Sequence, residues 1–412
     1  MTSTASDRKP QPIDPPEPDL TAQDLVDRAE RISAGLVERQ AETEERTQYG
    51  EQTHREITEA GLYRILVPRR YGGYEFGVDT FVRAAIAIAR GCGSTGWMYA
   101  FGTSHALQAA AVFGEDAQRE LFGSGHFVCP MTVRPQGYAD RAPGDDGWIV
   151  NGTFNFCSGA PYATHFMGHT LPSQGVDGRP RAPMLFIAPR DSWTMLDDWG
   201  RQLGLKGSGS HSIEFVDAFV PDRFTVPETQ VLALDVSQGT TGSVLHGNPM
   251  YGGSPFSFLL LEAGSMAVGI AQGALAAYDE LMTTKQIPIP PFCDRTEDPD
   301  YQRYYGEAVG KIAAAEAALL HCAGKWMTLA EQGRFTPEVD ARLIGICNEV
   351  IALCWDALSM RLFRTAGSTS VRTGERIERA WRDISTIHSH NALVNFAEMS
   401  RRQLSVAHFG SR

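Results

Sequence analysis

Histidines, serines and glycines that could take part in catalysis occur in this chain without the spacing of the common catalytic motifs. His388 and His390 are two residues apart, whereas two metal ligands on one helix face are four apart. Residues 207–210 (GSGS) come nearest to a glycine-rich phosphate loop, but they precede a β-rich segment instead of a helix. The sequence contains no P-loop and no GxSxG motif. We therefore predict no metal site, no zinc-hydrolase chemistry and no nucleotide-binding domain of the Rossmann type.

The charge balance and the cysteines restrict the partners and the compartment. The 412 residues include 37 Lys and Arg against 49 Asp and Glu, which gives a net charge of -12. An acidic chain with no basic cluster repels nucleic-acid phosphates and anionic membrane surfaces, so we expect neither partner. The seven cysteines are scattered without a CxxC pair, and no apolar stretch follows basic residues at the N-terminus. We therefore predict no disulfide framework and no signal peptide, and we expect the protein in the cytoplasm.

Apolar periodicity divides the chain into helical, β-rich and again helical parts. Proline and charge in residues 1–18 predict a disordered tail. Apolar residues at steps of three and four predict a helical domain over residues 19–125, including one continuous helix over residues 97–113. Short β-rich runs between Pro, Gly and Asp turns predict a compact β domain over residues 126–230.

Four long segments with helical periodicity make up most of residues 231–412. Long helices joined by short turns predict an antiparallel bundle, so the fold class is mainly α with a central β domain. The first segment is apolar but contains Glu262, and we interpret it as a buried helix and not as a membrane span. The segments are residues 256–282, 301–332, 337–366 and 375–409.

Several short motifs resemble those of one flavoprotein family. Residues 71–73 (YGG), 86–97 (IAIARGCGSTGW) and 150–159 (VNGTFNFCSG) resemble the acyl-CoA dehydrogenase-fold flavoproteins. Residues 377–383 (IERAWRD), followed by His390, resemble the two-component flavin-dependent monooxygenases. That branch includes hydroxyphenylacetate hydroxylase, the steroid-degrading phenol hydroxylases and dibenzothiophene monooxygenase. The resemblance extends over nearly the whole chain.

The resemblance implies a fold, an activity and partners. The fold would be an N-terminal helical domain, a middle β-barrel or β-sandwich domain and a C-terminal four-helix bundle. The activity would be that of an oxygenase component, which uses reduced FMN or FAD and O₂, through a flavin C4a-hydroperoxide, to hydroxylate an aromatic or polyketide-like small molecule. A separate NAD(P)H:flavin reductase would supply the reduced flavin, in agreement with the missing nucleotide motifs. The assembly would be a homotetramer built as a dimer of dimers.

By the same resemblance, residues of the β domain would hold the flavin. Ser158 would place its hydroxyl beside flavin N5, where a hydrogen bond protects the hydroperoxide, and Phe156 would lie against the ring. The other flavin contacts that the resemblance implies are Met131, Thr132 and Trp199. The residues alone also allow Ser158 to form only a turn at the end of a strand.

Three further residues are implied to face the substrate. His390 matches the histidine that related oxygenases place near the flavin and the substrate, and an imidazole exchanges protons near neutral pH. His105 follows Trp97 by eight residues, so a helix would put both on one face, where they would line the substrate pocket. Each of the three could instead be an ordinary packed side chain.

A different reaction class stays open at this point. An acyl-CoA dehydrogenase or oxidase needs a carboxylate base; residues 387–390 offer none, but Glu262 on an earlier helix is a possible base. N- or S-oxygenation within the same family and a non-catalytic ligand-binding relative are further alternatives. Arg379, Arg382 and Asp383 are expected to form ion pairs that fix the bundle helices.

Overall fold

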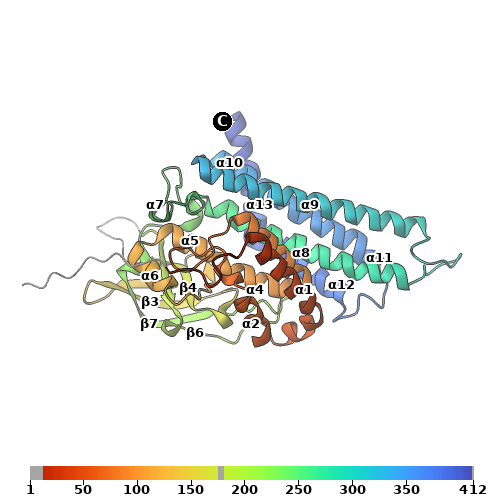
Figure 1. Ribbon diagram of the computed structural model, residues 1–412, viewed down its shortest axis with the longest axis horizontal. Helices are drawn as coiled ribbons and strands as arrows, with labels where there is room; N and C mark the ends of the chain where they lie inside the picture. The colour runs from red at the N-terminus through yellow and green to blue at the C-terminus, as the bar shows by residue number, and fades with distance from the viewer. Residues whose placement is uncertain (1–12, 175–180, 411–412) are drawn as a thin grey trace, which may run out of the picture.

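The computed structural model describes residues 13–174 and 181–410 of the chain. The N-terminal helices and a β domain lie together at one end of the molecule, and long C-terminal helices run from there to the other end (Figure 1). The predicted order of helical, β and helical parts is confirmed.

Six α-helices lie in the described residues before the β domain. Helix α1 begins with a capping box between Thr21 and Asp24, which pairs backbone N–H groups that the first turn leaves without partners. The helices are α1 (Ala22–Glu45), α2 (Glu51–Glu59), α3 (Val78–Gly91), α4 (Gly93–Thr103), α5 (His105–Val112) and α6 (Glu115–Phe122).

The predicted continuous helix over residues 97–113 is wrong, because α4 and α5 meet at Ser104. Ser104 keeps helical dihedral angles (φ −62°, ψ −33°), but the Leu107 amide donates to the Ser104 carbonyl at 2.9 Å. This i→i+3 hydrogen bond is typical of a 3₁₀ turn. The apolar pattern continues through the turn, so periodicity did not reveal the break.

Eight strands within the described residues form one mixed sheet. The strand order is β6-β7-β3-β2-β4-β5-β8, with β1 parallel to β4, and a parallel β2–β4 pairing joins the two antiparallel halves. Four phenylalanines (Phe154, Phe166, Phe186 and Phe215) pack in the domain core with ring centroids 5.2 to 5.8 Å apart. The strands are β1 (Met131–Thr132), β2 (Tyr138–Arg141), β3 (Gly147–Phe154), β4 (His165–Pro172), β5 (Met184–Pro189), β6 (Thr194–Met195), β7 (Ile213–Pro221) and β8 (Thr225–Val226).

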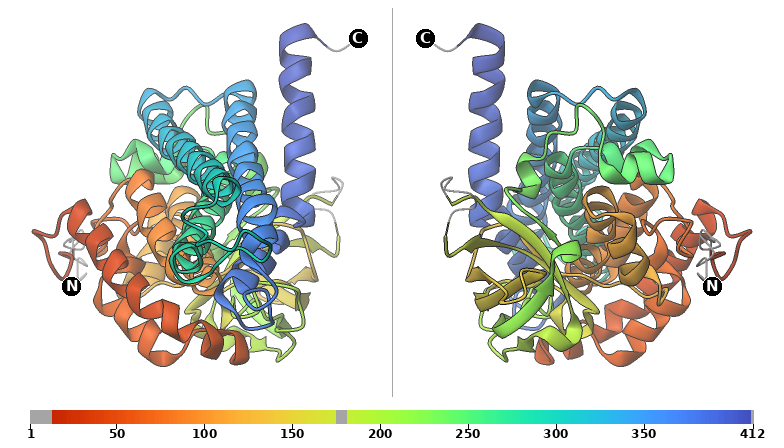
Figure 2. Two further views of the ribbon diagram at one scale, coloured as in Figure 1. Left: turned by 90° about the vertical axis from the view of Figure 1, so that its right-hand side faces the viewer. Right: turned by 90° about the vertical axis from the view of Figure 1, so that its left-hand side faces the viewer.

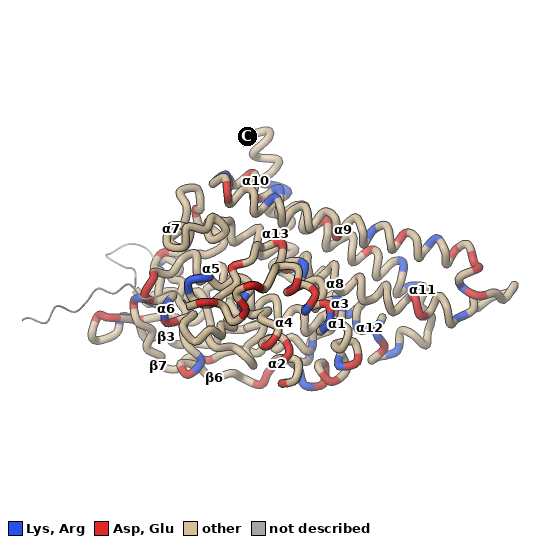
Figure 3. Tube along the Cα trace, viewed as in Figure 1, with Lys and Arg blue, Asp and Glu red and all other residues tan. Residues whose placement is uncertain are grey.

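The C-terminal part contains the long helices of the predicted bundle. A short helix, α7 (Thr241–His246), precedes them, and a π-helical turn (Ala357–Phe363) joins α10 to α11. Charges of both signs alternate along α9, so the acidic excess is not concentrated there (Figure 3). The remaining helices are α8 (Pro255–Thr284), α9 (Pro299–Gln332), α10 (Pro337–Asp356), α11 (Arg364–Ala366), α12 (Arg376–His388) and α13 (Asn391–Phe409).

The predicted single helix over residues 375–409 is wrong, because Ser389 and His390 separate α12 from α13. The Ser389 hydroxyl donates to the Ser385 carbonyl at 2.8 Å, and His390 takes extended backbone angles (φ −64°, ψ 117°). A serine that bonds back to the preceding turn competes with the continuation of a helix. The break puts His390 at the start of α13, and α13 then projects away from the rest of the molecule (Figure 2).

Helix α8 is long and apolar enough to cross a membrane, yet it lies inside the protein. Of its most apolar 18-residue segment, 78% is buried. The interpretation of this segment as a buried helix is therefore confirmed.

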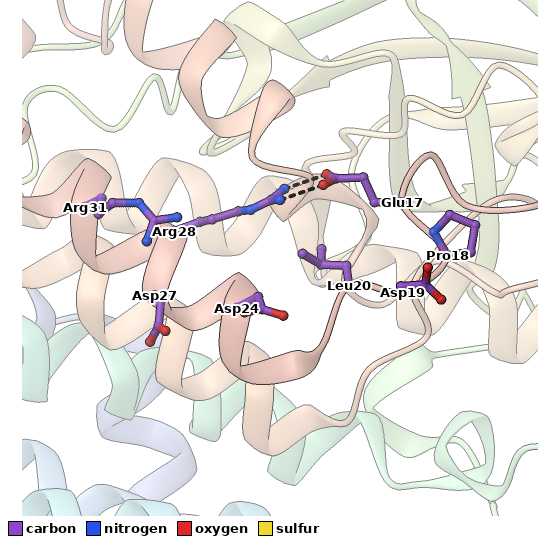
Figure 4. Close-up of a pocket in the computed structure, with 8 residues that line it drawn as sticks. All are labelled: Glu17, Pro18, Asp19, Leu20, Asp24, Asp27, Arg28 and Arg31. Carbon is purple, nitrogen blue, oxygen red and sulfur yellow. Dashed lines mark hydrogen bonds and ion pairs between the residues drawn. The ribbon is translucent and has the colours of Figure 1, made fainter.

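The prediction of a disordered tail is wrong for residues 13–18, while residues 1–12 lie outside the described residues. The Ile13 amide donates to the Arg70 carbonyl at 3.1 Å, and Glu17 accepts two hydrogen bonds of 2.7 Å from Arg28 (Figure 4). The first contact ties the segment to the loop before α3, and the second ties it to α1. A surface pocket of about 470 Å³ beside this ion pair is lined by residues 17–31, and none of the candidate catalytic residues lies in it.

Candidate active site

The turn after β3 presents two of the predicted flavin contacts. Phe156 has a left-handed backbone (φ 65°), and its side chain is 69% exposed. The Cys157 amide donates to the His211 carbonyl at 3.1 Å, which fixes the turn against the start of β7. The rings of Phe156 and Trp199 meet edge to face with centroids 6.2 Å apart. The turn thus offers an accessible aromatic surface next to Ser158.

Ser158 is one end of a chain of hydroxyl groups. The indole N–H of Trp97 donates to Ser158 Oγ at 2.9 Å. Ser158 Oγ is 2.8 Å from Ser210 Oγ, which is 2.7 Å from Ser208 Oγ. In the sequence, Ser208 and Ser210 stand out only as parts of a glycine–serine run. Their spacing of two residues was the signal that could have indicated that both side chains point to the same side of the loop. The chain orients the Ser158 hydroxyl, because each neighbour limits where its proton can point.

Trp97 stands between Ser158 and His390. The Trp97 and His390 rings have centroids 6.1 Å apart, and the His390 ring is accessible to solvent. Surrounding protein atoms lower the pKa of His390 below its ordinary value of 6.5, so the imidazole is neutral at pH 7 and can accept a proton. His388 instead stacks on Trp355 at 4.5 Å, away from this group. The structure therefore brings together the two predicted catalytic residues, which are far apart in the sequence.

Trp97 also begins a row of rings that leads to His105. The centroid distances are 4.5 Å from Trp97 to Phe101 and 6.4 Å from Phe101 to His105. His105 is buried, and its Nδ1 lies 2.7 Å from the Cys129 carbonyl, so Nδ1 holds the proton and donates it. Burial lowers the pKa of His105 to about 4 and keeps the ring neutral. The predicted common face of Trp97 and His105 is present despite the break at Ser104.

Met131 and Thr132 form β1, which pairs with β4. The Thr132 carbonyl accepts a 2.9 Å hydrogen bond from His169, while the Thr132 hydroxyl is buried without a hydrogen-bond partner in the described part of the chain. Gln136 links this segment to the turn, since its side chain accepts from the Asn155 amide at 3.1 Å. The Thr132 hydroxyl is one of several buried hydroxyls without a partner among the described residues, and it is free to bond a polar group of a ligand.

Glu262 in α8 is a second group capable of proton transfer, in a different environment. Its side chain is 0% exposed, and neither carboxyl oxygen has a hydrogen-bond partner among the described residues. Burial raises the pKa of Glu262 well above its ordinary value of 4.5, an effect that the facing hydroxyl of Ser104 only partly offsets. Burial therefore favours the protonated carboxyl group over the ionised one.

Taken together, these groups suit a planar heteroaromatic ligand with polar edges. Phe156 and Trp199 offer ring surfaces, Ser158 offers an oriented hydroxyl, and Thr132 offers an unpaired one. A flavin has this combination of a flat ring and hydrogen-bonding edges, so the residues present fit it. Within residues 13–174 and 181–410, no group of three or more His, Cys, Asp or Glu side chains is placed to hold a metal ion.

Comparison with known sequences places the chain in one family. Models of the acyl-CoA dehydrogenase N-terminal domain and C-terminal domain match residues 21–124 and 261–395. The pigment production hydroxylase of a Rhodococcus species is 28% identical over 385 residues, which cover 90% of this chain and 93% of that protein. The flavin-dependent monooxygenase oxygenase subunit HsaA of Rhodococcus jostii is 27% identical over 372 residues, which cover 89% of this chain and 94% of that protein.

Comparison with solved structures agrees on the fold. XiaF from Streptomyces, solved with FADH2 and glycerol, superposes with a TM-score of 0.84 at 22% identity and covers 95% of this chain and 96% of its own. Dibenzothiophene monooxygenase TdsC from Paenibacillus, solved with FMN and indole, gives a TM-score of 0.78 at 19% identity, covering 94% and 97%. The two domain models together span more than half of the chain, and the structures share its architecture throughout. The chain therefore belongs to the acyl-CoA dehydrogenase family.

Proposed function

We propose that this chain is the oxygenase component of a two-component flavin-dependent monooxygenase. It would use reduced FMN or FAD and O₂ to hydroxylate an aromatic or polyketide-like small molecule. The observation that supports this most directly is the position of Trp97, which is hydrogen-bonded to Ser158 and faces His390. The relatives that span nearly the whole chain are themselves hydroxylases or flavin-dependent monooxygenases by name.

Ser158 is the residue that we assign to the reactive edge of the flavin. A bound reduced flavin would supply the electrons that activate O₂. The Ser158 hydroxyl accepts from Trp97 and is paired with Ser210, which leaves it one hydrogen-bonding position for a ligand. Phe156 would pack on the ring, and Met131, Thr132 and Trp199 would surround it from the neighbouring segments.

His390 is the residue that we assign to proton transfer at the substrate. Its ring is accessible and neutral at pH 7, so it can take the proton of a phenolic hydroxyl or donate one as the substrate is oxygenated. The row from Trp97 to His105 would form the wall of the substrate pocket, where aromatic rings favour an aromatic substrate. These rings would also keep water away from a bound flavin, which favours product over the release of hydrogen peroxide.

The partners in this proposal are a flavin reductase and further copies of the chain. The absence of a nucleotide-binding motif from the sequence supports a separate NAD(P)H:flavin reductase. Helix α13 projects from the molecule with exposed apolar side chains at Val394, Val406 and Phe409, which supports association into a homotetramer (Figure 2). Light scattering at micromolar concentration should give four times the chain mass; a monomer would contradict this.

All seven cysteines are free, as expected in the cytoplasm.

Isotope labelling tests the proposed reaction. Chemically reduced flavin is mixed with the protein, ¹⁸O₂ and a panel of phenols and fused aromatic compounds, and the products are examined by mass spectrometry. We expect one ¹⁸O atom in a hydroxylated product. Bleaching of bound oxidised flavin by an acyl-CoA, without oxygen incorporation, would instead identify a dehydrogenase.

A further inference from the structure

We propose that Asp383 is a positioning residue, which holds the loop of residues 203–210 and thereby fixes the hydroxyl chain from Ser208 through Ser210 to Ser158. The inference rests on the proposed function, because it concerns how the Ser158 hydroxyl is kept at the flavin. Asp383 lies in α12, in the C-terminal part of the chain, and contacts neither Ser158 nor the Phe156 surface itself.

The first step is the hydrogen bond between Asp383 and Leu205. The Leu205 amide donates to Asp383 Oδ1 at 2.6 Å, and both residues are buried. Leu205 has a left-handed backbone (φ 53°), a conformation that is costly for a leucine. Such strain persists only where the surroundings hold the residue in place. Asp383 supplies that hold on the amide side of Leu205.

The second step leads from Leu205 to the serines. The Leu205 carbonyl accepts one hydrogen bond from the Trp199 indole and one from the Ser208 amide, each of 3.1 Å. Hydrogen bonds on both sides of Leu205 therefore fix the backbone that leads to Ser208. The Ser208 hydroxyl then meets Ser210, and Ser210 meets Ser158. A continuous series of hydrogen bonds therefore joins Asp383 to the proposed flavin contacts.

The third step concerns how closely the loop lies on α12. Arg382 Nη1 donates to the Leu203 carbonyl at 3.0 Å. A Cβ atom on Gly204 would lie 2.2 Å from the Arg382 carbonyl oxygen, so only glycine fits there. The loop backbone therefore lies directly on the backbone of α12 at Arg382 and Asp383.

The charged neighbours of Asp383 form ion pairs that connect α12 to α1. Arg382 pairs with Glu378 at 2.6 Å and with Glu44 at 2.7 Å, and Arg379 pairs with Glu44 at 2.8 Å. These pairs fix the bundle helix α12, so the predicted ion pairs of Arg379 and Arg382 are confirmed, with α1 as the partner helix, whereas Asp383 hydrogen-bonds to the Leu205 amide. The long side chains of Arg379 and Arg382 reach Glu44 on α1.

The carboxyl group of Asp383 lies among these charges, but its hydrogen bond goes to the Leu205 amide in the loop. Burial raises the pKa of Asp383 to about 7; the Leu205 amide, Arg382 and Arg379 lower it, and Glu44 raises it. The buried thiol of Cys92 also faces it.

The consequence is a defined failure when Asp383 is removed. In Asp383→Ala the Leu205 amide loses its acceptor, and the strained Leu205 can relax to an ordinary backbone. Ser208 and Ser210 then shift away, and the Ser158 hydroxyl is no longer oriented. The enzyme should still bind flavin, because Phe156 and the strand β1 lie outside the loop that shifts, but it should release hydrogen peroxide in place of product.

The experiment compares four variants by the hydrogen peroxide released per reduced flavin oxidised and by the dissociation constant for FMN from fluorescence quenching. Asp383→Ala should raise the peroxide yield relative to product at least about fivefold, as expected for one lost hydrogen bond. Asp383→Asn keeps an acceptor oxygen and should stay within about twofold of the wild type. Ser210→Ala interrupts the same chain without altering α12 and should leak like Asp383→Ala. The double variant should leak no more than either single one, because both act through one chain.

Arg379→Met is the matched control, since it breaks a buried contact of the same helix without touching the loop. It should lower the melting temperature but leave the peroxide yield unchanged. The inference would be overturned if Ser210→Ala or Asp383→Ala released no more hydrogen peroxide than the wild type. It would also be overturned if Arg379→Met released as much as Asp383→Ala. The Ser210→Ala measurement remains a test even if Asp383→Ala does not fold. If the wild type neither binds flavin nor forms product, the proposed function fails instead.

Discussion

Two regions of this molecule each contain a group that could transfer a proton, and they differ in their access to a ligand. His390 lies at the break between α12 and α13, with its ring accessible to solvent and facing Trp97. Glu262 lies inside α8, with no exposed surface and no hydrogen-bond partner among the described residues. The first region is built to meet a ligand and the second is closed.

The difference separates the two reaction classes that share this fold. A dehydrogenase needs an ionised carboxylate at the substrate, but burial raises the pKa of Glu262 and so disfavours its ionised form. An oxygenase needs a hydroxyl near the flavin and a group that exchanges protons near neutral pH, and Ser158 and His390 flank one tryptophan. The same fold can thus support either chemistry, and the environment of the acid–base groups decides which one.

Replacement of His390 should have the largest effect on this comparison. His390→Ala removes the proton-transfer group, so single-turnover hydroxylation with chemically reduced flavin should fall at least about tenfold, the low side of the range for general acid–base catalysis. The dissociation constant for flavin should stay nearly constant. Rapid mixing and product analysis measure the first quantity, and fluorescence quenching measures the second.

The neighbouring His388 is the matched control, because it stacks on Trp355 instead of facing Trp97. His388→Ala should leave hydroxylation nearly unchanged. Since the pKa of His390 is lowered, its neutral form is present at pH 7, and the wild-type rate should fall as the pH drops through that lowered value. A tenfold loss in His388→Ala with little loss in His390→Ala would reverse the assignment.

Replacement of Ser158 should affect the outcome of oxygen activation more than its rate. Ser158→Ala should still bind reduced flavin but release hydrogen peroxide in place of product, with product per flavin lowered roughly fivefold for about 1 kcal/mol of lost hydrogen bonding. The ratio of product to peroxide at full flavin oxidation checks this. Equal ratios in variant and wild type would remove Ser158 from the flavin site.

The sequence was sufficient for the fold and for part of the candidate site. Periodicity predicted the order of helical and β parts, and short motifs drew attention to Ser158, Trp97 and His390. Each motif is local, and the fold brings the three together across the sheet and two helices. The breaks at Ser104 and Ser389 were missed, because the apolar pattern continues through a single irregular turn.

The support of the site was out of reach of sequence reasoning for physical reasons. Asp383 and Leu205 are 178 residues apart in the chain, and no local pattern records such a contact. The left-handed backbone of Leu205 has no sequence signature either, because glycine or asparagine would normally mark it. The hydroxyl chain depends on where that strained residue is held.

Replacement of Glu262 should have the smallest effect on catalysis and a pH-dependent effect on stability. Because its pKa in the folded protein is raised above 4.5, the folded state keeps a proton that the unfolded state releases, so this group lowers the free energy of unfolding as the pH rises above that value. Glu262→Gln cannot ionise, so it should gain stability relative to the wild type as the pH rises above 4.5, measured by urea unfolding. Hydroxylation should change by no more than about twofold, because the closed interior around Ser104 gives a substrate no access to this position. A loss of hydroxylation greater than that of His390→Ala would show that the closed region opens to the substrate, and the comparison between the two regions would then have to be reversed.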